Sequence, residues 1–259
     1  MISWKRLAIG FVLVFTLLAG CAAVNDPGAG ITATPYPTPE IVRVSHAPAL
    51  RPALSAVLAC AESLPGVALL LYEVPVGKET PEGLRLWSGE PPDSAAAYAL
   101  GEERLVVVAH LESELASLSA EQLRLIFGGE AQNWAEVTGK AGDADLLIQV
   151  WTYPPGNELR GAFYQAIAGG ELANGFARLA PDPAAMLEAL ADDPGGIGYL
   201  PGAWLDEAVK QVTLERALLP ALRLPLTVWK EGELSRGEQA LIACLQSGGG
   251  SEILEQRYP

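Results

Sequence analysis

An α/β fold is predicted, because short apolar runs of strand length alternate along the chain with segments whose apolar residues recur at helical spacing. Segment 51–64 is typical of the predicted helices. Its apolar residues at the spacing i, i+3, i+4, i+7 are Leu54, Val57, Leu58 and Ala61. A strand-like run at 67–74 follows directly. This alternation favours a mostly parallel sheet with helices packed on its faces.

The remaining elements follow in the same order. The predicted strands are 41–44, 67–74, 84–87, 105–109, 146–150, 197–200 and 224–229. A helix at 119–127 begins with a capping box, Ser119 and Gln122, and ends at Gly128. Asp182 and Pro183 begin another helix. Further helices are predicted after Asn157 and, with Ser235 and Glu238 as the cap, at the C-terminal end.

Composition excludes several classes of function. The 259 residues carry a formal net charge of −14, and such a surface would repel the phosphates of nucleic acid. Two histidines and three cysteines leave little for a metal cluster. We therefore expect no nucleic acid partner, no metal and no cofactor.

The N-terminal segment is predicted to be a lipoprotein signal peptide, residues 1–20. A basic start, Lys5 and Arg6, precedes an apolar run that is short for a membrane span and ends in Leu-Ala-Gly before Cys21. This pattern resembles the lipobox of bacterial lipoproteins, which implies that Cys21 carries the lipid, palmitate included. The alternative is an ordinary signal peptide. Residues 21–40, rich in proline, are predicted to be the lipid anchor and a flexible tether.

A resemblance to a known family lies at 118–134. The runs 118–123, 126–129 and 133–134 look like a conserved block of phosphate-type substrate-binding proteins of ABC importers. The resemblance implies a two-lobed type II periplasmic-binding fold with a hinge of two crossing strands. We expect lobe 1 at 41–110 plus 201–259, and lobe 2 at 111–200.

A binding site is predicted at two strand-to-helix turns. A helix N-terminus offers unpaired N–H groups and a partial positive charge, so two such ends facing a cleft could hold an oxyanion despite the acidic surface. The candidate residues are Ser45, His46 and Ala47 in the first turn, Thr152, Gly156 and Asn157 in the second, and Trp87 and Ser88 as a third wall. Ordinary turn and core roles are the alternative for each of them.

The second turn departs from the family pattern. Phosphate binders of this kind carry Ser-Gly-Thr-Arg before the phenylalanine, whereas this chain has Asn157-Glu158-Leu159-Arg160 before Phe163. The arginine is kept, and we expect Arg160 either to meet an anion or to pair with Glu158. The Glu158 carboxylate suits a helix start and could take the place of the anion. Phosphate itself is therefore in doubt as the ligand.

Cys60 and Cys244 remain after lipidation, on two helices assigned to lobe 1. An exported protein meets oxidising conditions, which favours a disulfide between them. Two buried free thiols are the alternative.

Three functions fit these observations. The leading one is a monomeric, lipid-anchored receptor on the extracytoplasmic face of a bacterial membrane, which binds a small solute, phosphate or a related oxyanion, and delivers it to an ABC permease. The second is a sensor of the same fold with an altered or lost anion pocket. The third, a lipid-anchored hydrolase, is disfavoured because no hydrolase motif is present, so we expect no enzyme.

Overall fold

The computed structural model describes residues 38–140 and 146–258. The predicted signal peptide, Cys21 and the tether as far as residue 37 lie outside the described residues. Within the described ranges, no helix has both the length and the apolar character needed to span a membrane.

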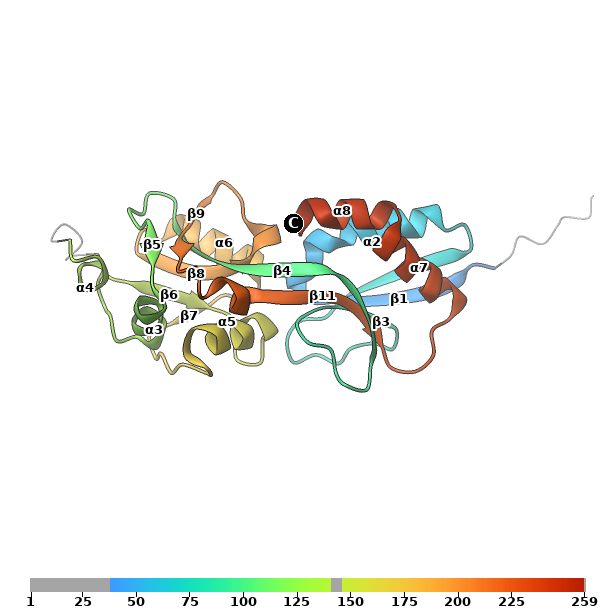
Figure 1. Ribbon diagram of the computed structural model, residues 1–259, viewed down its shortest axis with the longest axis horizontal. Helices are drawn as coiled ribbons and strands as arrows, with labels where there is room; N and C mark the ends of the chain where they lie inside the picture. The colour runs from blue at the N-terminus through green and yellow to red at the C-terminus, as the bar shows by residue number, and fades with distance from the viewer. Residues whose placement is uncertain (1–37, 141–145, 259) are drawn as a thin grey trace, which may run out of the picture. The chain divides into compact units, whose positions relative to one another are not determined.

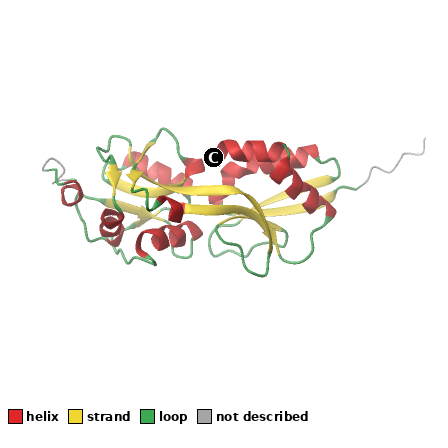
Figure 2. Ribbon diagram, in the orientation of Figure 1, coloured by secondary structure: helices red, strands yellow, loops and turns green. Residues whose placement is uncertain are grey.

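Strands and helices alternate over much of the described chain, although residues 67–118 hold four strands in succession (Figures 1 and 2). The longer strands are β1 (Glu40–His46), β2 (Val67–Glu73), β3 (Leu84–Ser88), β4 (Ala96–His110), β6 (Gln149–Thr152), β8 (Gly196–Pro201) and β11 (Arg223–Lys230). The short strands are β5 (Ser117–Leu118), β7 (Arg178–Leu179), β9 (Val209–Gln211) and β10 (Thr213–Leu214). The α-helices are α2 (Leu54–Ser63), α3 (Ala120–Gly128), α4 (Trp134–Thr138), α5 (Glu158–Ala168), α6 (Pro183–Asp192), α7 (Arg236–Ser247) and α8 (Gly249–Arg257). Three short 3₁₀ helices are η1 (Pro48–Ala53), η3 (Gly202–Trp204) and η4 (Leu219–Leu222).

The main sheet of the described chain has nine strands in the order β2-β1-β3-β11-β4-β8-β6-β7, with β9 paired to β4. The expectation of a mostly parallel sheet is wrong for its centre. Pairs toward the two edges are parallel, whereas β11 runs antiparallel to both β3 and β4, and β4 runs antiparallel to β8. The centre differs because β4 and β11 are long strands that cross the sheet beside each other in opposite directions (Figure 1).

Two separate hydrophobic cores lie along this sheet. The first contains residues of β1, β3, α2, α7 and α8, and the second contains residues of α3, α5, α6 and β8. Strand β4 contributes to the second core from Leu105 onward, while Tyr98 and Leu100 pack against the first. Residues 209–224, which we expected in lobe 1, supply Val209, Val212 and Leu222 to the second core.

Local sequence signals set most helix ends. Ser119 with Gln122 and Ser235 with Glu238 form capping boxes at α3 and α7, and Asp182 caps α6 through the N–H of Ala185. The helix predicted at 51–64 instead begins as the 3₁₀ helix η1, and its α-helical part starts at Leu54. Pro52 explains the difference, since its ring has no N–H for an α-helical hydrogen bond.

A disulfide joins Cys60 of α2 to Cys244 of α7, with the two Cα atoms 5.8 Å apart. The N-terminus of α8 packs tightly over this bond, because a Cβ atom on Gly250 would lie 2.5 Å from the Cys60 sulfur. The disulfide therefore joins α2 to α7, and α8 packs against the joined pair.

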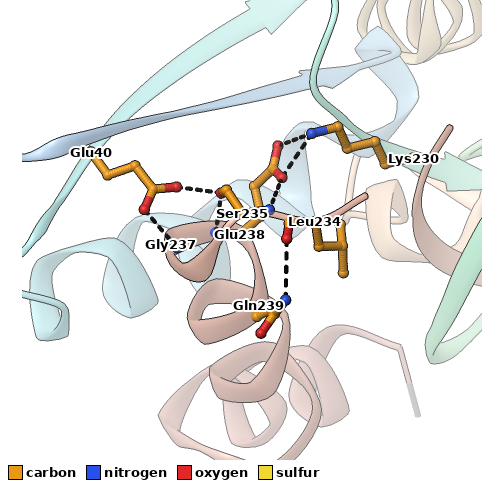
Figure 3. Close-up of polar contacts among 7 residues, drawn as sticks. All are labelled: Glu40, Lys230, Leu234, Ser235, Gly237, Glu238 and Gln239. Carbon is orange, nitrogen blue, oxygen red and sulfur yellow. Dashed lines mark hydrogen bonds and ion pairs between the residues drawn. The ribbon is translucent and has the colours of Figure 1, made fainter. Parts of the chain in front are cut away.

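Polar contacts at the start of α7 fasten β1 to the same core (Figure 3). The Glu40 carboxylate accepts a hydrogen bond from the Ser235 hydroxyl and another, of 2.9 Å, from the Gly237 N–H. A Cβ atom on Gly237 would lie 2.8 Å from Glu40 Oε1, so a larger residue at this position would displace the Glu40 carboxylate. Next to it, Lys230 Nζ donates to both carboxylate oxygens of Glu238 at 2.8 and 2.9 Å.

Candidate functional site

A cavity of about 180 Å³ lies between residues of the two cores. On the side of the first core it is bounded by the end of β1, the loop after β2 and strand β3. On the side of the second core it is bounded by the first residues of α5 and α6. The cavity therefore joins segments that are far apart in the sequence, 45–87 on one side and 156–183 on the other.

Six of the residues predicted as a binding site line this cavity: Ser45, His46, Ala47, Trp87, Gly156 and Asn157. The two strand-to-helix turns identified in the sequence thus face the same space. Three other predicted residues, Ser88, Thr152 and Arg160, are not part of its lining.

Thr152 and Ser88 are buried in the protein interior. The Thr152 hydroxyl shares a 2.8 Å hydrogen bond with the Tyr199 hydroxyl and accepts one of 3.2 Å from Tyr164, so it links two core tyrosines. Ser88 is 2% exposed, and its Oγ has no hydrogen-bond partner among the described residues. Strand alternation explains its position, since Ser88 follows the inward-facing Leu84 and Leu86 at period two.

Arg160 points away from the cavity and is fully engaged elsewhere. Its Nη1 donates to the Tyr153 carbonyl at 3.0 Å, and its Nε donates to Glu171 at 3.1 Å. The guanidinium also lies 5.0 Å from the centre of the Tyr164 ring. Arg160 therefore pairs with neither an anion in the cavity nor Glu158, the two roles expected for it.

The N-terminus of α5 is largely satisfied by its own residues. Asn157 Oδ1 accepts hydrogen bonds from the N–H groups of Leu159 and Arg160 at 2.9 and 3.3 Å. Burial raises the pKa of the Glu158 carboxyl, while a hydrogen bond from the N–H of Glu158 itself opposes this rise. Since Glu158 also lines the cavity, a carboxylate of the protein stands where an anion would otherwise meet the helix end.

The turn after β1 also has few donors to spare. The Ser45 hydroxyl donates to the Leu84 carbonyl at 3.2 Å. His46 Nδ1 lies 2.9 Å from the Ala47 carbonyl, so this nitrogen carries the proton and Nε2 is left for other contacts. His46 is 4% exposed, which makes it an ordered part of the cavity wall.

Two cationic side chains of the cavity were missed in the sequence, Arg85 and Lys78. Arg85 stacks on the Trp229 ring, with 4.6 Å between the guanidinium carbon and the ring centre. Over residues 38–140 and 146–258, neither cation forms an ion pair with a carboxylate. The available signal was alternation: Arg85 lies between Leu84 and Leu86 and so faces away from the first core.

An ion-pair chain crosses one side of the cavity. Arg51 of η1 makes hydrogen bonds of 2.6 and 2.7 Å to Glu73, and this contact lowers the pKa of the Glu73 carboxyl. The same guanidinium lies 3.6 Å from Asp182, the N-cap of α6. Elements of the two cores are thereby connected beside the cavity.

Comparisons with known proteins support the fold. No protein-family model matches the chain. The phosphate-binding protein PstS of Bacillus subtilis (strain 168) is 28% identical over 133 residues, which is 49% of this chain and 42% of that protein. The match thus spans less than half of that curated relative. A phosphate-bound ABC transporter substrate-binding protein from Clostridium perfringens superposes with a TM-score of 0.72 at 15% identity, covering 85% of this chain and 98% of the other.

The chain has a type II periplasmic-binding fold. The resemblance predicted from residues 118–134 is confirmed at the level of this fold. The type II fold also occurs in regulators. The regulatory domain of CcmR from Synechocystis PCC6803, in complex with 2-PG, superposes with a TM-score of 0.56 at 14% identity, covering 80% of this chain and 96% of that domain. The fold alone therefore does not define the function, which depends on the residues of the cavity.

Proposed function

We propose that this chain is an extracytoplasmic solute-binding protein of an ABC importer, which binds a small oxyanion in the cavity and delivers it to a permease. The observation that carries the proposal is the cavity itself, in which turns from both cores meet beside Arg85 and Lys78, two cations without an ion-pair partner in the described part of the chain. Binding proceeds by closure of the two lobes over the solute, without covalent chemistry. The protein acts as a monomer held to the membrane by a lipid on Cys21.

A pair of arginine variants tests the binding site. Arg85→Ala removes a cation that lines the cavity, whereas Arg160→Ala removes one that points away from it. Thermal shift and titration calorimetry with phosphate, sulfate, molybdate and methylphosphonate should identify a ligand, since a ligand of the folded state stabilises it in proportion to the logarithm of its concentration above Kd. We expect the affinity of Arg85→Ala for that ligand to be at least tenfold lower than that of the wild type. The affinity of Arg160→Ala for the same ligand should stay within about twofold of the wild-type value. Absence of binding by every oxyanion would contradict the proposal.

The membrane anchor needs its own experiment. Radiolabelled palmitate should enter the wild-type protein in bacterial cells and should be absent from Cys21→Ala. Equal labelling of the two proteins would remove the anchor from the proposal and leave the solute site unaffected.

A sensor of the same fold is the second candidate, favoured by the start of α5, where Glu158 and Asn157 occupy the helix N-terminus that would otherwise meet an anion. Uptake of the identified oxyanion by cells separates the two functions. If the protein is a receptor, cells that carry Arg85→Ala should take up less of this oxyanion. If these cells take up as much as wild-type cells although the variant protein binds the oxyanion more weakly, the result supports the sensor.

A further inference from the structure

The cavity is larger than a bare oxyanion requires. Its volume is about 180 Å³, whereas a single water needs only about 10–15 Å³ of such space. An inorganic oxyanion with five heavy atoms would leave much of this volume to be filled by water or by another part of the ligand.

The first-core side of the cavity has an apolar wall, formed by Pro75 and Val76 in the loop after β2 and by Trp87 of β3. Pro183 of α6 adds an apolar residue on the second-core side. Val76 is 36% exposed although it is a large aliphatic residue, and its Cγ1 lies 3.6 Å from the position of a Cβ atom on Gly156. The loop of the first core thus carries an apolar side chain across to the start of α5 in the second.

The donors that would surround a free tetrahedral anion are few. The Ser45 hydroxyl and the first N–H groups of α5 already have partners within the protein. Arg85 and Lys78 remain, which form no ion pair among the described residues, and both belong to the side of the first core. Each lies two residues from an apolar lining residue, Trp87 and Val76 respectively, so the cavity offers both charged and apolar contacts, which suits a ligand that has one end of each kind.

We propose that this cavity binds an organic oxyanion, a phosphonate or phosphate monoester whose charged group faces Arg85 and whose substituent packs against Val76 and Trp87. This inference rests on the proposed solute-binding function and narrows its ligand class. The substituent fills the volume that an inorganic anion leaves empty and covers the apolar wall.

Titration calorimetry with inorganic phosphate, methylphosphonate and phenylphosphonate tests the inference. We expect phenylphosphonate to bind at least tenfold more tightly than phosphate, since a few apolar carbon contacts in a pocket are worth about 10-fold or more. Val76→Ser should remove most of that preference, measured as the ratio of the affinity for phenylphosphonate to the affinity for phosphate. Leu70→Ser, which changes an exposed leucine of β2 outside the cavity, is the matched control and should retain the preference.

The outcomes separate this inference from the function on which it rests. If phosphate binds as tightly as phenylphosphonate, or if Val76→Ser keeps the preference for phenylphosphonate, the inference of an organic ligand is wrong. The proposed solute-binding function then still stands. Binding of none of the three anions or of the wider oxyanion panel overturns both.

Discussion

Replacing Glu103 with glutamine should remove a pH-dependent loss of stability. Glu103 lies in β4 near the passage between the two cores and is 2% exposed. Its Oε1 accepts the Arg104 N–H at 2.8 Å, whereas its Oε2 has no partner among the described residues. Burial raises the pKa of this carboxyl from 4.5 to about 7, and hydrogen bonds from the N–H groups of Arg104, Ala203 and Gly202 limit the rise.

The sign and size of this effect on the free energy of unfolding follow from proton linkage. The folded pKa lies above the unfolded pKa, so the folded state binds the proton more tightly and loses stability as pH rises from about 4.5 through 7. The Glu103 contribution to the free energy of unfolding should fall by about 2–3 kcal/mol between pH 5 and pH 8. Glutamine stays neutral, so Glu103→Gln should gain stability relative to the wild type by a similar amount over this range.

Urea denaturation of both proteins at pH 5, 6, 7 and 8 measures the difference. Glu102→Gln is the control. Glu102 directly precedes Glu103 in β4, but its side chain is 56% exposed and pairs with Arg223. The reasoning is refuted if the stability difference between Glu103→Gln and the wild type is the same at pH 5 and pH 8. It is refuted as well if Glu102→Gln shows the same pH dependence.

Three further predictions concern contacts within the two cores. Cys244→Ser should lower the free energy of unfolding by up to about 4–5 kcal/mol, because the disulfide closes a long loop. Urea denaturation measures this loss, and equal urea midpoints for the variant and the wild type would contradict it. Alkylation of both thiols in the unreduced wild type would contradict it as well. Glu40→Gln should cost about 1 kcal/mol through weaker acceptance at the start of α7, measured by urea denaturation against the exposed control Glu62→Gln. Phe163→Leu should cost about 1 kcal/mol or more because its ring stacks on Tyr199 at 3.9 Å, and a Tm equal to that of the wild type would refute it.

Local signals in the sequence predicted most of the fold. Capping residues and prolines act within a few positions of where they stand, so the starts of α3, α6 and α7 were predicted within a residue. Strand β4 was predicted only at 105–109, although it begins at Ala96. Its first half is mostly exposed and has no run of buried apolar residues, and it is a strand because β11 pairs with it from Ala96 to Arg104. That pairing depends on residues more than 100 positions away.

The structure brings some of the candidate site residues together at one cavity and places others elsewhere. The turns at 45–47 and 156–157 do line one cavity, since residues at strand ends beside helix starts are placed by the fold. Arg160 was expected there because it matches a family motif, but Glu171 and the Tyr153 carbonyl bind it instead. Arg85 was missed because a charged residue in a short strand usually faces solvent, and the cavity that receives it is formed by distant segments.

Strands β4 and β11 each run from one core into the other, which affects whether a fragment of this protein can fold. Each core takes an inner strand from both of these chain segments, as the pairing of β4 with β8 and of β11 with β3 requires. A fragment cut at 111–200 would keep α3, α5 and α6 but would leave β8 without its β4 neighbour and expose a hydrophobic sheet edge. We therefore expect the fragment 111–200 to aggregate rather than to fold on its own.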